Sequence, residues 1–238
     1  MRFAFAVVMA SFFGAASAET PPTPIPDDLD PCWAFTEDAT YVNHTIVMQL
    51  EHREVKMRVP IDYFEDRWDR KDGFRDTAQL FSVDIGTFEM VTRPDTKVRK
   101  KNGIRSLLLF LISDHIPMER LAPHAAEMFI PGGNPDRPLA DYSRMDGPFG
   151  LEEIKSPSKE IKKEINKNIY IDFDETGQLK TVLNCNAPGT LMNPGCEQFF
   201  EAAGLDVSAT YDLSELPNWR RVQDNVTRFL TCATSSNL

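Results

Sequence analysis

Three residues in the middle of the chain are candidates for acid–base chemistry. Asp114 and His115 follow the apolar run Leu107–Ile112 after one serine, and His124 lies a short distance further on. A histidine oriented by a carboxylate is a common general base in hydrolases, and catalytic residues do occur where strands end. The sequence therefore allows a hydrolase built on these three residues. However, it contains no G-x-S-x-G elbow, no S-x-x-K accompanied by its partner motifs, no close histidine spacing for a metal and no Gly-rich phosphate loop.

Asp172–Gly177 resembles the first half of a calcium-binding loop, because side-chain oxygens alternate along it before a glycine. A calcium loop needs a bidentate acid at its twelfth position, where this chain has Leu183. The flanking residues also form strand-like rather than helical patterns. We therefore expect an ordinary hairpin turn at residues 174–177, and we expect no metal site and no cofactor.

The basic residues of this acidic chain are concentrated around Asn102-Gly103. This dipeptide accepts the positive φ angles of a type I′ turn, so we expect a β-hairpin between residues 96–101 and the strand that starts at Ile104. A basic hairpin tip suits an acidic protein partner. The alternative is a solvated tip whose lysines only prevent edge-to-edge pairing. The candidate partner-binding residues are Lys97, Arg99, Lys100, Lys101 and Arg105.

The N-terminus shows the features of a secretory signal peptide in the usual order. Arg2 supplies the positive charge, residues 3–13 are mainly apolar, and Ala16-Ser17-Ala18 matches a signal-peptidase site. We expect cleavage between Ala18 and Glu19, with export to the periplasm or the cell exterior. The apolar run is shorter than the roughly 20 residues that a membrane span requires, and no later segment is long enough, so no transmembrane span is expected.

Four cysteines follow the signal, and an exported protein with an even number of cysteines is expected to pair them. Cys185 and Cys196 lie at the two ends of a turn-rich loop, which favours a disulfide between them. Cys32 and Cys232 then remain to join the two ends of the chain. No C-x-x-C spacing is present to indicate a metal or redox site.

Composition limits the partners and the size of the fold. The chain has 238 residues and a formal net charge of −10, so it repels nucleic acid. After the signal at residues 1–18 comes a proline-rich segment, residues 19–31, which we expect to be extended. Residues 32–238 are expected to form one domain closed by the disulfides.

The hydrophobic pattern predicts an α+β fold with a mainly antiparallel sheet, hairpins and an amphipathic C-terminal helix. Leu107–Ile112 has no polar side, which favours a central strand covered on both faces. Residues 131–150 are rich in glycine and proline and read as a long irregular loop. The other expected strands are Thr45–Leu50, Glu54–Val59, Gln79–Ile85, Ile169–Phe173, Gln178–Leu183 and Leu205–Tyr211; the expected helices lie at residues 117–129, 156–167 and 216–230.

These features favour an exported, non-enzymatic binding protein over an enzyme. Such a protein would present hairpin tips and the 131–150 loop to a protein or small-molecule partner, and an inhibitor or immunity-type role suits a small, acidic chain closed by disulfides. Two alternatives stay open. One is a periplasmic hydrolase that uses Asp114, His115 and His124, and the other is a structural protein of the cell envelope without a discrete site.

Overall fold

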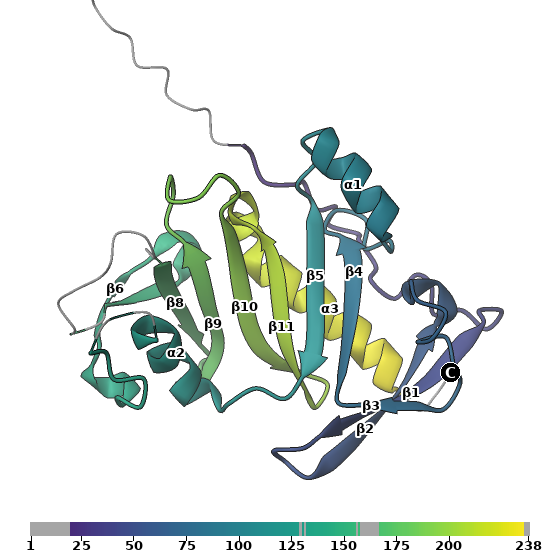
Figure 1. The fold of residues 1–238 in the computed structure, drawn as a ribbon, viewed down its shortest axis with the longest axis horizontal. Coiled ribbons are helices and arrows are strands. Elements are labelled where there is room, and N and C mark those ends of the chain that lie inside the picture. The colour runs from purple at the N-terminus through teal and green to yellow at the C-terminus, as the bar shows by residue number, and fades with distance from the viewer. Residues whose placement is uncertain (1–19, 129, 131, 156, 158–166, 236–238) are drawn as a thin grey trace, which may run out of the picture.

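An eight-stranded antiparallel sheet forms the centre of the molecule (Figure 1). The computed structural model describes residues 20–128, 130, 132–155, 157 and 167–235, so the predicted signal peptide lies outside it. The expected α+β class with a mainly antiparallel sheet is confirmed. The strands, in spatial order, are β4 (Ala78–Asp84), β5 (Leu107–Ser113), β11 (Leu205–Asp212), β10 (Gly195–Ala202), β9 (Leu179–Asn186), β8 (Lys167–Phe173), β7 (Glu152–Lys155) and β6 (Ser143–Asp146).

A smaller three-stranded sheet lies beside the β4 end of the large sheet (Figure 1). The two predicted strands Thr45–Leu50 and Glu54–Val59 correspond to β1 (Tyr41–Met48) and β2 (Arg53–Pro60), which pair antiparallel. The third strand, β3 (Phe74–Asp76), runs parallel to β1 and lies in a strongly charged segment of the chain.

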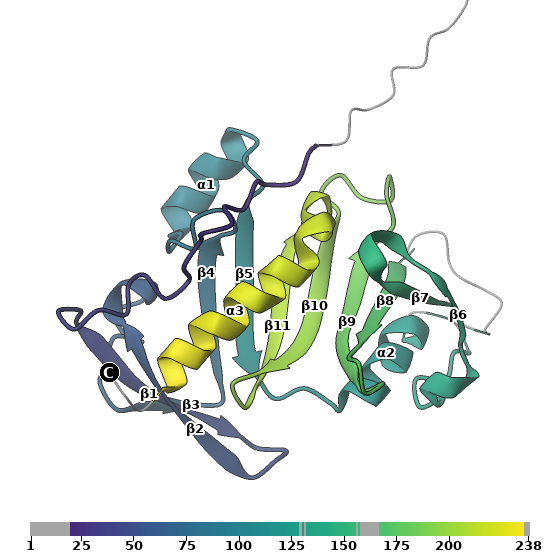
Figure 2. The same ribbon diagram turned by 180° about the vertical axis from the view of Figure 1, so that it is seen from behind.

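The C-terminal helix α3 (Trp219–Thr234) crosses one face of the large sheet diagonally (Figure 2). Its buried residues recur every third or fourth position and include Val222, Val226 and Phe229, as the amphipathic pattern predicted. They pack against the inward side chains of β4, β5 and β11 in the main core. The helix begins at Trp219 because the 3-10 helix Leu213–Asn218, which contains Pro217, precedes it.

Helix α2 (Met118–Glu127) covers the opposite face of the sheet, but only at β8 and β9 (Figure 1). Its Leu121 and Ala122 pack with Ile171 and Val182 in a second apolar cluster. Side chains alternate between the faces of a strand, and the neighbouring Thr181 instead contacts α3 by a hydrogen bond to Gln223. Strand β9 is therefore covered on both faces, whereas α2 does not reach β4, β5 or β11. No helix among the described residues is long and apolar enough to cross a membrane.

Residues 20–31 of the proline-rich N-terminal segment contain no helix or strand, and they are bound along α3 (Figure 2). The amide of Thr23 donates to the buried carboxylate of Glu215 at 3.0 Å. Arg221 of α3 donates to the carbonyls of Ile25 and Pro26 at 2.8 and 2.7 Å. These contacts make the segment part of the folded structure.

Both disulfides expected from the sequence are present. Cys185 and Cys196 are direct partners across β9 and β10, so their disulfide closes the loop between these strands. Cys32 and Cys232 join the N-terminal segment to α3. A link between residues so far apart in sequence restricts the unfolded chain strongly, by about 5 kcal/mol in the chain-entropy model.

The expected hairpin at Asn102-Gly103 is wrong, because these residues end a helix. Helix α1 (Arg93–Lys101) starts with a capping box in which Thr92 and Asp95 exchange hydrogen bonds, and proline occupies its first turn. Asn102 is the C-cap, and Gly103 follows with a φ of +69°. A positive φ suits the end of a helix as well as a hairpin turn, so the dipeptide alone does not distinguish them.

Strand β5 lies inside the sheet, but the prediction that both of its faces are covered is wrong. Leu108, Phe110 and Ile112 are fully buried on the α3 side. Leu107, Leu109 and Leu111 are only half-buried on the other side. The apolar run therefore places leucines on a face that no core covers completely.

The predicted irregular loop at residues 131–150 is largely ordered around one buried carboxylate. Glu127 is 1 % exposed and accepts hydrogen bonds from the amide of Asn134 and the hydroxyl of Tyr142. Arg137 forms an ion pair with it at 3.3 Å. The segment includes β6 and two short 3-10 helices. The predicted helix at residues 156–167 lies almost wholly outside the described residues.

His44 makes the small sheet sensitive to acid. It is 1 % exposed, it packs against Phe74, and neither ring nitrogen has a hydrogen-bond partner among the described residues. Burial lowers the pKa of His44 below its usual 6.5, although Asp76 opposes this shift. The unfolded chain therefore binds more protons than the folded chain as pH falls below 6.5.

We expect the free energy of unfolding to fall with acidification more steeply in the wild type than in His44→Phe. The difference has an upper limit of one proton, about 1.4 kcal/mol per pH unit, and it is confined to the pH range between the lowered pKa of the folded histidine and the ordinary pKa of the unfolded one. Urea unfolding of both proteins at pH 7 and pH 5 measures it. Equal losses of unfolding free energy in the two proteins would contradict the claim that His44 makes the fold sensitive to acid.

Candidate functional site

Half of the large sheet has one face that α3 does not cover and that borders the α2 cluster only at β10, where Phe199 packs against it. On strands β4, β5, β11 and β10, the side chains opposite α3 form two rows across the sheet. The first row contains an apolar stripe with a leucine that is 53 % exposed. We call this surface the open face. Its rows are Leu80, Leu111, Ser208 and Phe199, and Ser82, Leu109, Thr210 and Glu197.

A groove crosses the β4–β5 part of the open face beneath α1. Two adjoining cavities of about 670 and 430 Å³ form it, and Thr96, Lys100, Leu107 and Leu109 line both. Leu80 completes the apolar floor in the larger cavity. We call the two cavities together the α1 groove. Its volume is in the range of sites that take a small molecule or a few side chains of a partner.

The walls of the α1 groove carry opposite charges. Arg93 of α1 bridges them where it pairs with Glu65 and Asp66, at 3.4 and 2.9 Å. Among the described residues, no ion pair engages the remaining charged side chains of the larger cavity. These are the acidic Asp69 and Asp76 on one wall and the basic Lys97 and Lys100 on α1.

Asp69 lies in a strongly acidic part of this wall. Burial raises the pKa of Asp69, and the neighbouring carboxylates of Asp66 and Asp76 raise it further. An approaching cationic group would relieve this repulsion. The acidic wall therefore favours a positively charged side chain of a ligand or partner.

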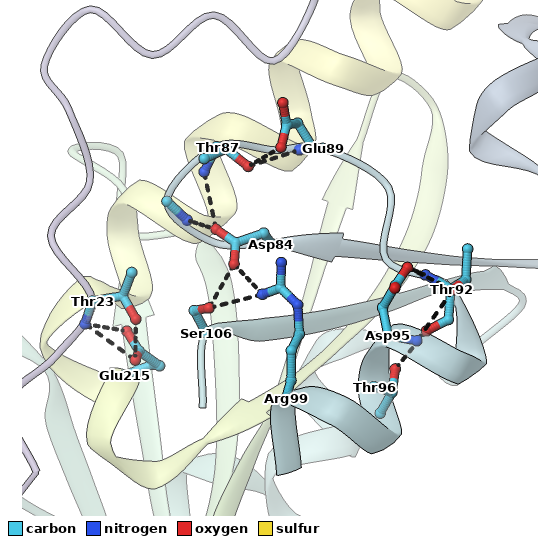
Figure 3. Close-up of polar contacts among 11 residues, drawn as sticks. Thr23, Asp84, Thr87, Glu89, Thr92, Asp95, Thr96, Arg99, Ser106 and Glu215 are labelled. Atoms are coloured by element: carbon cyan, nitrogen blue, oxygen red, sulfur yellow. Dashed lines mark hydrogen bonds and ion pairs between the residues drawn. The ribbon is translucent and has the colours of Figure 1, made fainter. Parts of the chain in front are cut away.

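One buried carboxylate anchors α1 to the sheet (Figure 3). No residue of α1 is itself buried, so the helix has no apolar anchor of its own. Arg99 pairs with Asp84 at the end of β4, and Ser106 donates to the same carboxylate oxygen at 2.5 Å. The other oxygen accepts from the amides of Gly86 and Thr87 at 2.8 and 3.1 Å.

The environment of Asp84 keeps it ionised. Burial alone would raise the pKa of Asp84, but hydrogen bonds from Ser106, Arg99 and the amide of Gly86 outweigh it and lower the pKa. The position of α1 over the groove therefore depends on a partly buried ion pair rather than on apolar packing.

The structure separates the five basic candidates into two groups. Arg99 is held by Asp84, and Arg105 pairs with Asp212 at 3.1 Å, so both make structural contacts. Lys97, Lys100 and Lys101 are exposed along α1 rather than at a hairpin tip. Of these three lysines, Lys97 and Lys100 line the α1 groove.

Asp114, His115 and His124 do not form one site. Asp114 accepts the amide hydrogen of Leu50 at 3.2 Å and so braces the β1–β2 turn. His115 lies next to Asp206, whose carboxylate is 3.7 Å from its Nδ1 and accepts its amide hydrogen at 3.0 Å. His124 lies half-buried on α2. None of the three lines the α1 groove, and no group of three or more potential ligands among the described residues could hold a metal ion.

Sequence reasoning missed the floor of the groove and its acidic wall. The signal for the floor was available, because Leu107–Ile112 places leucines on both sides of a strand. The acidic wall comes from a charged segment that looks like a solvated loop when only the sequence is considered. Its proximity to α1 depends on the pairing of β3 with β1 and of Arg93 with Glu65.

Comparisons with known proteins identify a similar fold. No protein-family model and no curated protein matches the sequence. The structure resembles that of Smlt3025, an immunity protein of the Stenotrophomonas maltophilia type IV secretion system, with a TM-score of 0.58 and 15 % identity over 84 % of this chain and 97 % of that one. The Neisseria meningitidis iron-regulated outer membrane lipoprotein FrpD aligns with a TM-score of 0.46 and 12 % identity over 90 % of this chain and 98 % of its own. At this identity, the likeness to Smlt3025 shows a shared fold.

Replacing Arg99 should loosen α1. We expect Arg99→Met to cost about 2 kcal/mol of unfolding free energy, because it leaves the carboxylate of Asp84 without its cationic partner. Lys101→Met is the matched control, since Lys101 is exposed on the same helix. Urea unfolding measures the cost, and amide hydrogen exchange shows whether the α1 amides lose protection first. A similar effect of both substitutions would refute the anchor.

Proposed function

We propose that this chain is an exported, non-enzymatic binding protein of immunity type, which binds a protein partner through its open face. The observation that carries the proposal is the uncovered half of the sheet, where an apolar stripe adjoins the charged α1 groove. Protein interfaces combine an apolar centre with a polar rim in this way. An uncovered apolar surface on a sheet otherwise packed by helices marks an interaction site.

The disulfides support the location. Cysteine pairs persist in oxidising compartments, so two disulfides fit a protein that works in the periplasm or outside the cell. The signal-peptide pattern at the N-terminus predicts the same destination.

The fold likeness supports the type of partner by analogy. Smlt3025 is described as an immunity protein of a secretion system, and this chain shares its fold over most of both chains. One fold serves many functions, so the argument for binding comes from the open face itself. An immunity-type role adds that the partner is a toxic protein whose activity the complex suppresses.

The open face is tested by capturing partners with the wild type and two matched variants. Leu80 is 53 % exposed on the open face, and Leu50 is 62 % exposed in the β1–β2 turn. The mature protein, Leu80→Glu and Leu50→Glu serve as baits in periplasmic extract of the cells that produce it. We expect a partner that Leu80→Glu retains at least about tenfold less than the other two, which corresponds to about 1.4 kcal/mol.

The immunity-type part is tested on that partner. Its toxic or enzymatic activity should fall when the wild type or Leu50→Glu is added and should persist with Leu80→Glu. Equal capture by all three baits would refute binding through the open face. A captured partner whose activity the wild type leaves unchanged would refute the immunity-type role.

A further inference from the structure

We propose that the α1 groove receives a segment of the partner in which an apolar residue lies between a basic and an acidic residue. This inference rests on the proposed function, because it names the chemistry of the segment that would bind at the open face. Three properties of the groove support it: an apolar floor, two walls of opposite charge, and charged groups that have no ion-pair partner within the described part of the protein.

The apolar floor of the groove favours a large apolar residue at the centre of the partner's segment. Leu80, Leu107 and Leu109 line the larger cavity, and Met90 and Val91 add apolar surface at its edge. The cavity of about 670 Å³ has room for a large aliphatic or aromatic side chain together with its flanking residues. Burying such a side chain removes apolar surface from water on both partners, which contributes about 25 cal/mol per Å² before the costs of association.

The acidic wall of the groove favours a basic residue on one side of that apolar residue. Asp69 and Asp76 line the larger cavity only, and their mutual repulsion contributes to the raised pKa of Asp69. A lysine or arginine of the partner would neutralise this wall. Nearby Arg93 pairs with Glu65 and Asp66, and its charge offsets only part of the rise in the pKa of Asp69.

The basic wall of the groove favours an acidic residue on the other side of the apolar residue. Lys100 lines both cavities, so the positive wall extends to the point where they join. The second cavity continues past Arg105, whose charge is already matched by Asp212. A carboxylate of the partner would therefore face Lys97 and Lys100 as the nearest cations without an ion pair.

Two other occupants fit the walls less well. A purely acidic segment would suit α1 alone, but the acidic wall would repel it. A purely apolar segment would leave all four unpaired charges facing a dry interface, which costs free energy. Selection from random peptides distinguishes these occupants from the mixed segment even while the partner is unidentified.

The probe is a phage-displayed library of random peptides of about 12 residues, which extend to about 40 Å. It is selected on the mature protein and counter-selected on Leu80→Glu. We expect enriched peptides to place a basic residue, a large apolar residue and an acidic residue in one order. Purely acidic peptides, uncharged apolar peptides or no enrichment over Leu80→Glu would each overturn the inference.

Charge reversal then tests the two walls with the enriched peptides. Lys97→Glu with Lys100→Glu, and Asp69→Lys with Asp76→Lys, should each weaken binding at least about tenfold, and salt should weaken wild-type binding. Lys101→Glu is the control for α1, because it reverses one lysine charge on the same helix outside the groove. Glu175→Lys, at the exposed tip of the β8–β9 hairpin, is the control for the acidic reversal.

The neutral pair Lys97→Gln with Lys100→Gln covers the case in which reversal unfolds α1, and it should still weaken binding. Binding that is insensitive to both walls, or equally sensitive to the controls, would overturn the inference. The two proposals fail separately. If a partner is captured through Leu80 but the selected peptides lack the basic–apolar–acidic order, the proposed function stands and the inference about the groove fails. If the peptides show this order but no partner is captured, only the proposed function fails.

Discussion

The ring of Phe229, buried on α3, contacts five aromatic rings from other parts of the chain. It meets Phe35 of the N-terminal segment, Tyr63 after the small sheet, Phe88 after β4, and Phe81 and Phe110 of the large sheet, with ring centroids 4.8 to 5.6 Å apart. Such pairs add about 0.5–1.5 kcal/mol each to the free energy of burial. A change at this ring therefore disturbs the N-terminal segment, both sheets and α3 together.

This packing also explains why one face of the sheet remains open. A single helix covers the sheet on one side. Every second side chain of β4, β5 and β11 points towards this helix and packs against its core residues. The other alternate side chains must then point away, to a side where α2 reaches only β8 and β9. Leu107 and Leu109 are half-buried there and line the groove together with α1, which is held by the Asp84–Arg99 pair instead of by a core. Elements with few apolar contacts open at low free-energy cost, so the groove has its least stable wall at α1.

Local signals explain which elements the sequence predicted. The 174–177 turn and the C-terminal helix depend on neighbouring residues, namely a carboxylate that caps its own turn and an apolar periodicity along one helix face. Asn102-Gly103 depends on its surroundings, because the same dipeptide suits a hairpin or a helix end. Here the capping box at Thr92, several residues upstream, starts a helix, and Asn102-Gly103 ends that helix. Strand β10 was missed since it starts directly after the turn-rich loop that Cys196 closes.

The site was harder to predict because no motif encodes it. A stretch such as Leu107–Ile112 indicates that both sides of a strand are apolar. Which element covers each side depends on the rest of the fold. On the α3 side that partner is internal, and the resulting burial stabilises the protein. On the other side the same leucines lie between lysines and aspartates from distant segments. Apolar contact there would supply affinity, while the opposed charges would reject segments of the wrong charge order, so one surface combines attraction with discrimination.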